Sequence, residues 1–319
     1  MRSALIIYNP QAGHLSVKPF ISSIIHTLQK TGWKVSAAQT RSGNHATRLA
    51  RQAAEKGLTA VFAVGGDGTV GQVASGLIGS ETALGVLPAG TSNVLAKDFG
   101  LPLFNWTNWN ALETNANLLA NAPIHAIDIG TCNGQPFLLW AGIGLDALTI
   151  HTLEPRLRVE KIFTFPEYAA TAIWNASNWH GVWLTLNADG KDVEGHFLLA
   201  VANNIRRYMG GMTVLSPQAY LDDGMFDLWL FPGDSLADAL RHTFDLWAGR
   251  HLASEHIRRL TFQSLGVRAK TPVYIQADGE PLPPTQEVEI RVQRRALRML
   301  MPPGALDLLC GNLSSSTST

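Results

Sequence analysis

The chain has 319 residues, of which 46% are apolar and 16% are charged. This length suffices for two domains, and the composition argues against a disordered chain and predicts a globular protein with substantial buried cores. Lysine plus arginine equal aspartate plus glutamate at 25 each, so no global positive charge indicates a nucleic-acid partner, and we expect none.

The cysteines and the apolar runs of the sequence indicate the cellular compartment of the protein. Cys132 and Cys310 lie far apart without metal-ligand spacing, which favours free buried thiols in a reducing environment. No secretory signal is recognisable before the first expected strand, and no apolar run approaches the ~18 residues of a membrane span. We therefore expect a cytoplasmic protein. Residues 312–319 are expected to form a disordered tail.

Apolar runs alternate with helical segments over the first 125 residues. In chain order, the pattern predicts strand 5–8, helix 19–30, strand 33–38, helix 44–56, strand 59–64, helix 70–78, strand 83–87 and a helix from residue 94. This alternation predicts a doubly wound α/β domain over 1–125, with 302–311 as a candidate completing segment. Because the carboxyl ends of parallel strands share one edge of a sheet, the loops after them are expected to converge on one ligand.

The run Val64-Gly65-Gly66-Asp67-Gly68-Thr69-Val70 joins the third strand to the next helix. Glycines let backbone N–H groups approach an anion, and a helix N-terminus adds unpaired donors and about half a positive charge. The run therefore predicts a cradle for nucleotide phosphates. An ordinary strand-to-helix turn with Thr69 as the N-cap is the alternative, because a lone glycine loop is a weak motif.

After about residue 125 the pattern changes to β. Asn-Gly or Asp-Gly pairs at 133–134, 189–190 and 278–279 separate alternating or apolar runs, which is typical of hairpin turns. We therefore expect a β-sandwich domain over 126–301, interrupted by helices over 153–178 and 234–252. By itself, the pair Asp278-Gly279 indicates a turn rather than a catalytic site.

Several motifs follow one another in a fixed order along nearly the whole chain. They are NPxAG at 9–13, GGDGT at 65–69, LPxGTxN at 87–93, GIGLDA at 142–147, NN at 203–204, YMGGM at 208–212, LDDGxFDL at 221–228 and DGE at 278–280. In this combination the chain resembles the diacylglycerol kinase catalytic-domain family, and within it the bacterial soluble lipid kinases of the YegS type. The resemblance implies transfer of the ATP γ-phosphoryl group to a lipid hydroxyl, in a cleft between an α/β nucleotide-binding domain and a C-terminal β-sandwich.

The resemblance also implies roles for single residues. Glu280 would be the proton acceptor, with Asp278 beside it and Asp67 at the phosphates and metal, since phosphoryl transfer needs charge neutralisation and an oriented acceptor hydroxyl. The implied ATP-binding residues are Asn9, Thr40, Gly65, Gly66, Asp67, Gly68, Thr69, Val70, Gly71 and Thr91. A structural Mg²⁺, separate from the one that accompanies ATP, would take the Asp223 carboxylate and the main-chain carbonyls of Tyr220 and Met225, an all-oxygen set that suits this ion.

The chain departs from the family pattern at Gly71, Gln72 and Val94, the last standing where an aspartate is common, and this keeps alternatives open. The glycine motif usually continues Thr-x-Asn-Glu, whereas this chain has Gly71 and Gln72, so a catalytically weak nucleotide or lipid sensor is one alternative. A soluble-substrate kinase of the NAD kinase or phosphofructokinase type is another, because those enzymes also use a Gly-Gly-Asp-Gly loop. The later motifs favour the lipid kinase.

A kinase that acts on a lipid must reach a bilayer surface, so we expect peripheral membrane contact. The candidate interfacial residues are aromatic or basic: Trp106, Trp109, Trp174, Trp179, Trp183, Arg156, Arg158, Lys161, Arg206 and Arg207. Core tryptophans and solvated arginines are commoner than interfacial ones, so none is assigned singly. The lipid and the oligomeric state are left open.

Overall fold

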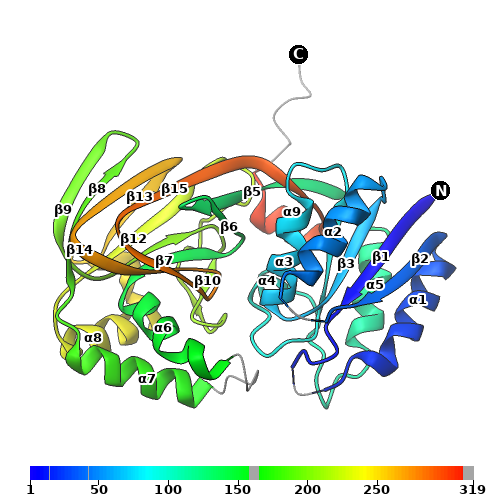
Figure 1. Ribbon diagram of the computed structural model, residues 1–319, viewed down its shortest axis with the longest axis horizontal. Helices are drawn as coiled ribbons and strands as arrows, with labels where there is room; N and C mark the ends of the chain where they lie inside the picture. The colour runs from blue at the N-terminus through cyan, green and yellow to red at the C-terminus, as the bar shows by residue number, and fades with distance from the viewer. Residues whose placement is uncertain (14, 42, 158–164, 312–319) are drawn as a thin grey trace. The chain divides into compact units, whose positions relative to one another are not determined.

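The computed structural model describes residues 1–13, 15–41, 43–157 and 165–311 (Figure 1). The chain divides into two compact units. Unit 1 comprises Met1–Asp128, Tyr220–Asp223 and Arg294–Thr319, and unit 2 comprises Ile129–Ala219 and Gly224–Gln293. The tail predicted to be disordered, 312–319, lies outside the described residues.

Unit 1 begins with alternating strands and helices, as predicted. In chain order they are β1 (Arg2–Tyr8), η1 (Lys18–Phe20), α1 (Ile21–Lys30), β2 (Trp33–Gln39), α2 (His45–Glu55), β3 (Ala60–Gly65), α3 (Asp67–Leu77), β4 (Ala83–Pro88), α4 (Val94–Asp98) and α5 (Ala111–Ala120). The strands are parallel in the order β4-β3-β1-β2. The doubly wound α/β fold is therefore confirmed.

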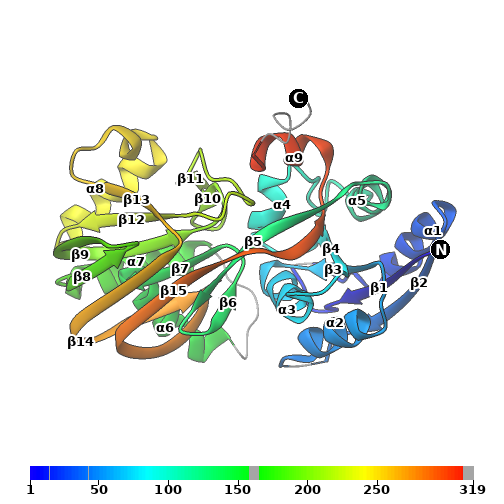
Figure 2. The ribbon, with the colours of Figure 1, turned by 90° about the horizontal axis from the view of Figure 1, so that it is seen from above.

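Helices cover both faces of this parallel sheet (Figure 2). On one face α1 and α5 bury an apolar cluster in which Ile6, Leu28 and Phe62 have no exposed surface. On the other face lie α2 and α3, which contact each other. All six residues of β3 are buried, as expected for a strand covered on both faces. This packing holds the strand ends, and the loops that follow them, in place.

Unit 2 is mainly antiparallel sheet. The remaining elements of the chain are β5 (Ile124–Cys132), β6 (Gln135–Phe137), β7 (Trp140–Gly144), α6 (Leu145–Leu157), α7 (Phe165–Asn178), β8 (Val182–Ala188), β9 (Lys191–Asn203), β10 (Arg207–Tyr208), β11 (Thr213–Val214), β12 (Phe226–Pro232), α8 (Leu236–Trp247), η2 (Arg250–Ala253), β13 (Arg258–Phe262), β14 (Ser264–Ala277), β15 (Glu280–Leu300) and α9 (Pro303–Leu309). β5 and β15 each have residues in both units, and α9 belongs to unit 1. The strands of unit 2 share one apolar core, which includes Phe137, Phe226 and Phe262.

The three predicted hairpin turns are confirmed. They join β5 to β6, β8 to β9 and β14 to β15. The first residue of each turn, Asn133, Asp189 and Asp278, has φ of 47°, 48° and 51°, and the glycine that follows also has positive φ. Two successive left-handed residues make a type I′ turn, whose twist matches that of the flanking strands.

Two predicted helices are each divided in the structure. The helix predicted over 153–178 is two helices, α6 and α7, and residues 158–164 between them lie outside the described residues. The helix predicted over 234–252 is α8 followed by the short η2. Gly249 separates these two elements with φ of 68°, because a left-handed residue ends a helix.

The chain passes between the two units more often than predicted. The sequence predicted boundaries at 125 and 301, whereas unit 1 also includes residues 220–223 and begins again at residue 294. The end of β15 belongs to unit 1, where Met299 pairs with Leu84 of β4. Residues 220–223 also belong to unit 1, where the N–H of Leu221 donates to the carbonyl of Leu309 at 2.7 Å. These pairings join residues far apart in sequence, so local pattern could not locate them.

Candidate functional site

The carboxyl ends of the four parallel strands lie in one row. Three backbone hydrogen bonds join neighbouring ends: Thr40 N–H to Tyr8 O at 2.9 Å, Asn9 N–H to Val64 O at 3.1 Å, and Ala89 N–H to Gly65 O at 2.9 Å. The loops after β1, β3 and β4 therefore begin side by side within unit 1. This confirms the expectation that these loops converge.

Glycines bring these loops into backbone contact. A Cβ built on Gly90 would lie 2.3 Å from the Cα of Gly66, and a Cβ on Gly13 would lie 2.4 Å from the carbonyl oxygen of Ala89. Gly13 also has φ of 62°, a left-handed conformation that glycine adopts without strain. The three glycine-containing motifs thus pack together and do not act as separate turns.

Asn93 closes the loop after β4. Its φ of 49° is left-handed, which asparagine tolerates better than most side chains. Its Oδ1 accepts the N–H of Gly90 at 2.8 Å, and its Nδ2 donates to the Gly90 carbonyl at 2.7 Å. Asn93 therefore stabilises the loop after β4 by binding the backbone of Gly90. The sequence motif did not predict this role.

α3 begins inside the glycine motif. Its N-cap is Gly66 and its first residue is Asp67, so the alternative with Thr69 as N-cap is wrong. The N-cap residue Gly66 has no side chain to accept the first-turn N–H groups. The N–H of Thr69 donates to the Gly66 carbonyl at 2.9 Å, and the exposed backbone at Gly68 is where the helix start can meet an anion. Gly68 is exposed, and a Cβ there would meet no described heavy atom within 4 Å. The start of α3 is therefore an open cradle that fits phosphate groups.

The Asp67 carboxylate joins the cradle to the loop after β4. Its Oδ1 accepts the N–H of Val94, the first residue of α4, at 2.8 Å. Burial raises the pKa of the Asp67 carboxyl above its ordinary value, while the N–H groups of Val94 and Leu95 and the charge of Lys97 act in the opposite direction. The structure thus shows Asp67 as a link between two loops, and its role at a metal ion stays a prediction.

The other predicted nucleotide residues lie in or next to the same loops. The Asn9 side chain accepts the N–H of Gln11 at 3.0 Å in an Asx turn. Thr40 directly follows β2, Thr91 is exposed, and Gly71 lies inside α3. Their contacts with a nucleotide stay predictions.

The predicted catalytic carboxylates of unit 2 lie on the turn between β14 and β15. Glu280 is exposed and is the first residue of β15. The Asp278 carboxylate accepts the backbone N–H groups of Leu138 at 2.6 Å, Leu139 at 2.7 Å and Trp140 at 3.1 Å. Asp278 therefore fastens the segment before β7 to the turn that carries Glu280.

The turn at Asp189 uses its carboxylate in the same way. The two oxygens of Asp189 accept the N–H groups of Gln263 at 2.7 Å and Ser264 at 2.8 Å. An Asp-Gly turn that binds a neighbouring backbone segment therefore occurs twice in unit 2. The contacts of Asp278 alone indicate a positioning role, and only Glu280 extends from this turn as an exposed carboxylate.

Gln276 connects the same turn to α6, a contact that the sequence did not predict. Gln276 is 1% exposed. Its Nε2 donates to Oδ2 of Asp146 at 2.7 Å, and its Oε1 accepts the N–H of Gly279 at 2.8 Å. Asp146 belongs to the GIGLDA motif, so this glutamine links two family motifs. A single glutamine within a strand carries no local signal of such a role.

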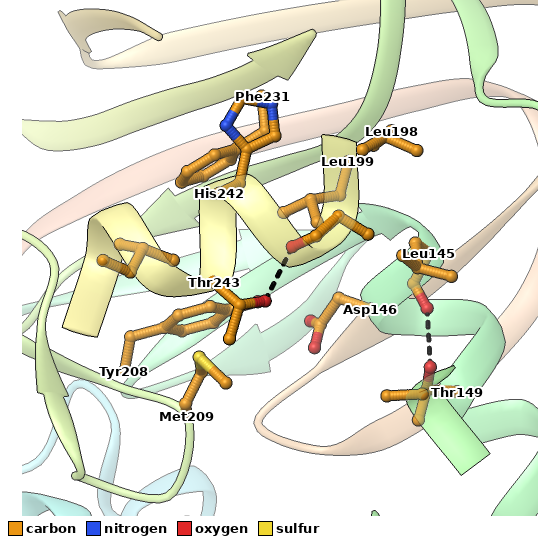
Figure 3. Close-up of a pocket in the computed structure, with 13 residues that line it drawn as sticks. Leu145, Asp146, Thr149, Leu198, Leu199, Tyr208, Met209, Phe231, His242 and Thr243 are labelled. Carbon is orange, nitrogen blue, oxygen red and sulfur yellow. Dashed lines mark hydrogen bonds between the residues drawn. The ribbon is translucent and has the colours of Figure 1, made fainter. Parts of the chain in front are cut away.

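An apolar cavity of about 90 Å³ lies within unit 2, lined by residues of α6, α7, α8 and neighbouring strands (Figure 3). Its apolar lining includes Leu145, Leu198, Leu199, Tyr208, Met209 and Phe231. Asp146 lies among these side chains, near Thr149 and Thr243 (Figure 3). Burial lowers the pKa of His242, which also lines the cavity. The cavity thus combines an apolar wall with a few polar groups.

The residues predicted to hold a structural Mg²⁺ divide between the units. Tyr220 and Asp223 belong to unit 1 and are exposed, whereas Met225 belongs to unit 2. Their role as ligands stays a prediction.

Asp222, next to the predicted ligand, is the buried carboxylate of this segment. It accepts hydrogen bonds from the Nε2 of His125 and from the N–H of Gly311, both at 2.8 Å. Ligand atoms of His125, Asp222 and Cys310 lie within 4.8 Å of one another. Burial also raises the pKa of the Cys310 thiol to about 12. The group therefore acts as a tie between chain segments.

Both cysteines are free and buried, as the sequence predicted. Burial raises the pKa of the Cys132 thiol to about 12, as it does for Cys310. Neither is available as a thiolate at neutral pH.

Comparison with known proteins identifies the family. Residues 3–132 match the diacylglycerol kinase catalytic domain, and residues 142–308 match the YegS C-terminal NAD kinase beta sandwich-like domain. These matches, together with the glycine loops, define a class of two-domain kinases. The chain belongs to the diacylglycerol kinase and YegS-like lipid kinase family, as the sequence motifs predicted.

Two relatives illustrate the likeness. A "Diacylglycerol kinase" of Bacillus subtilis is 29% identical over 285 residues, which cover 88% of this chain and 90% of that protein. A "Probable lipid kinase YegS-like" of Pseudomonas putida is 30% identical over 310 residues, which cover 95% of this chain and 96% of that protein.

Solved structures share the fold. The crystal structure of a diacylglycerol kinase from Bacillus anthracis has a TM-score of 0.74 at 24% identity and covers 95% of this chain and 98% of that one. An NAD kinase from Archaeoglobus fulgidus in complex with ATP has a TM-score of 0.53 at 11% identity, with 96% of each chain covered. At these identities the likeness shows the fold alone.

Proposed function

We propose that this protein is an ATP-dependent lipid kinase that transfers the γ-phosphoryl group of ATP to a hydroxyl of a diacylglycerol-like lipid. The observation that carries the proposal is the open cradle at the start of α3, where Gly68 is exposed, a Cβ on Gly68 would meet no described heavy atom within 4 Å, and the N-cap is a glycine. Membership of a kinase family supports a phosphotransferase.

In this proposal the glycine loops of unit 1 bind the nucleotide. Backbone N–H groups at Gly66 and Gly68 bind phosphate oxygens, and the hydroxyls of Thr40 and Thr91 donate to the nucleotide. A Mg²⁺ ion that accompanies ATP would neutralise charge on the phosphates. Asp67 is the carboxylate of this loop that could orient the ion, in addition to holding the N-terminus of α4.

Glu280 is the proposed general base of unit 2. It accepts the proton of the lipid hydroxyl while the oxygen forms a bond to the γ-phosphorus and the bond to ADP breaks. The products are ADP and a phosphomonoester lipid, and the proton leaves Glu280 to solvent. Asp278 and Gln276 act as positioning residues, because both hold the turn that carries Glu280.

The apolar cavity of unit 2, at about 90 Å³, is smaller than a typical small-molecule site and suits only a short hydrocarbon portion of a substrate. Its wall includes Leu198, Phe231 and Leu246, which would favour acyl methylenes over a sugar or nucleotide. Asp146 and Thr149 add polar oxygens to the same cavity, where Asp146 accepts from Gln276 and the Thr149 hydroxyl donates to the Leu145 carbonyl at 2.9 Å.

Exposed aromatic residues support the proposed membrane contact. Trp174 is 70% exposed and Trp106 is 65% exposed. Trp179, in contrast, packs against the core of unit 2, and its Nε1 donates to the Leu198 carbonyl at 3.0 Å. The side chains of Arg156, Arg158 and Lys161, also candidates, lie outside the described part of the chain.

Helix α8 adds an apolar stripe that the sequence analysis did not single out. Leu240, Phe244 and Trp247 follow at helical spacing and are 52%, 51% and 76% exposed. The guanidinium of Arg250 lies 5.4 Å from the ring centre of Phe244. Aromatic residues beside a cation suit a lipid interface. None of the described helices is long and apolar enough to span a bilayer, so the proposed contact is peripheral.

An acceptor-competition assay tests the substrate class. The protein is incubated with γ-labelled ATP, Mg²⁺ and vesicles that contain diacylglycerol, and in parallel with NAD or fructose 6-phosphate. We expect label in the organic extract of the lipid reaction alone. Label retained in the aqueous phase with a soluble acceptor would replace the lipid proposal by a soluble-substrate kinase. ATP binding without transfer to any acceptor would favour a nucleotide or lipid sensor. Gly71 and Gln72, which depart from the family motif, would then be the residues to test for the loss of activity.

A further inference from the structure

A second cavity, of about 300 Å³, lies within unit 1 and is lined by none of the predicted nucleotide residues. Its lining consists of Ile124, His125, Ala126, Arg295 and Arg298. Three of these five residues are basic, two are apolar and none is acidic. Because the chain as a whole has a formal net charge of zero, the positive charge that the two arginines bring to this cavity is local.

The imidazole of His125 is fixed from behind by a buried carboxylate. Asp222, which is 5% exposed, accepts from the His125 Nε2 at 2.8 Å. The backbone N–H of Gly311 donates to the other oxygen of Asp222, also at 2.8 Å. Two segments distant in sequence therefore hold the ring of this cavity residue in one orientation.

Arg295 is held by a second buried carboxylate. Its φ of 50° is left-handed, which is costly for a long side chain and needs support from surrounding contacts. That support comes from Asp128, which has no exposed surface and whose Oδ1 accepts the backbone N–H of Arg295 at 2.7 Å. The backbone of this arginine is therefore set by the fold and not by local preference.

Arg298 is only weakly engaged. Its Nη2 lies 2.5 Å from Oε2 of Glu81, but the Glu81 side chain is 84% exposed and that of Arg298 is 42% exposed. Solvent-exposed ion pairs of this kind contribute little. A guanidinium has five N–H donors, so the contact with Glu81 leaves others for a ligand.

We propose that this cavity binds a phosphomonoester dianion. Two guanidinium groups can each offer paired donors to phosphate oxygens, and the fixed imidazole adds a third contact. Ile124 and Ala126 form an apolar wall for the organic part of the ligand. The volume is at the lower end of the ~300–1,000 Å³ typical of small-molecule sites. A phosphorylated lipid headgroup and free phosphate share this chemistry, and the site is independent of the proposed kinase activity.

Calorimetric titration with inorganic phosphate tests the site. The key variant is the double substitution Arg295→Asn and Arg298→Gln, in which asparagine suits the left-handed φ at 295. The single variant Arg298→Gln serves if the double variant does not fold. Two controls are matched: Glu81→Gln removes the ion pair and keeps both arginines, and Arg268→Gln with Arg291→Gln removes the same charge from exposed positions of unit 2.

We expect the dissociation constant for phosphate to rise at least tenfold in the double variant. Glu81→Gln should bind phosphate as tightly as the parent or more tightly, and the unit 2 double variant should match the parent. Phosphate can also bind at the α3 cradle. Only the phosphate binding that the parent shows and the double variant lacks is therefore assigned to this cavity. Equal phosphate binding by the parent and the double variant, both folded by circular dichroism, would overturn the proposal.

Sedimentation with vesicles identifies the source of the phosphomonoester. Phosphatidylcholine vesicles with and without phosphatidate are compared for the parent and the double variant. If phosphatidate-dependent sedimentation is lost in the double variant, a lipid headgroup occupies the cavity. If sedimentation is the same in both proteins while the calorimetric difference persists, the cavity takes a soluble phosphomonoester.

Discussion

The side-chain amide of Gln276 donates to the carboxylate of Asp146 at 2.7 Å, across 130 residues of sequence. The same side chain accepts the N–H of Gly279 at 2.8 Å. A residue that lines the apolar cavity is thereby connected to the turn that carries Glu280, through one buried glutamine. This glutamine fixes the turn relative to the cavity within unit 2.

Replacing Gln276 by methionine should destabilise the protein by about 1–3 kcal/mol, because the buried Asp146 carboxylate and the Gly279 N–H each lose a partner. Urea denaturation measures the change. Gln286→Met is the matched control, since Gln286 is exposed and makes one contact, to the carbonyl of Lys270, and should change stability by less than about 0.5 kcal/mol. Equal stability of the two variants would contradict the structural role of Gln276.

Asp278→Asn should lower stability by about 1–3 kcal/mol, because an amide offers one acceptor oxygen where the carboxylate serves several N–H groups. Asparagine tolerates the left-handed φ of the turn, so the substitution isolates the carboxylate.

Asp189→Asn is the control for this substitution, since Asp189 clamps a neighbouring backbone segment from an equivalent turn. Both variants should lose stability to a similar extent. At a temperature where both are folded, only Asp278→Asn should lower the kcat of the proposed reaction. Full activity in both variants would remove Asp278 from the site.

Asp67→Asn should raise the melting temperature at neutral pH. Because burial raises the pKa of this carboxyl in the folded state, the folded protein is destabilised relative to the unfolded chain once pH rises above the unfolded pKa, and the penalty is complete above the folded pKa. The advantage of the variant should therefore shrink as pH falls through that range. Asp307→Asn, at an exposed position of α9, is the control. A lower melting temperature for Asp67→Asn at pH 7 would contradict the account.

Two glycine substitutions distinguish nucleotide binding at the start of α3 from the packing of the loops against each other. Gly68→Ala adds a methyl group where no described heavy atom lies within 4 Å, so stability should change by less than about 1 kcal/mol, while ATP affinity should fall about tenfold. Gly90→Ala places its Cβ 2.3 Å from the Cα of Gly66 and should destabilise by about 1–3 kcal/mol. Thermal denaturation and nucleotide titration together check both. Unchanged ATP affinity in Gly68→Ala would place the nucleotide elsewhere.

The features that sequence predicted are those that local chemistry determines. The strand-loop-helix units of unit 1 follow from apolar periodicity, and the type I′ hairpins follow from Asn-Gly and Asp-Gly pairs that tolerate positive φ. The alternation of strands and helices indicates a parallel sheet. In such a sheet the glycine loops follow the carboxyl ends of the strands and therefore converge at one edge.

The contacts that sequence missed depend on residues brought together by the whole fold. The pair His125 and Asp222 is separated by 97 residues, and the bond from Arg295 to Asp128 spans 167. No local pattern marks such partners. The N-cap at Gly66 was missed for a different reason: the hydroxyl of Thr69 is a common cap, but this helix starts on bare backbone.

The central claim is that this chain phosphorylates a lipid hydroxyl with Glu280 as the base. The most direct measurement is the rate at which label from γ-labelled ATP enters the organic phase with Mg²⁺ and diacylglycerol vesicles, for the parent and for Glu280→Gln. Glu280 is exposed, so the variant should fold, and the account predicts a rate reduced at least about 100-fold. Equal rates for parent and variant, or no lipid labelling by a folded parent that binds ATP, would contradict it.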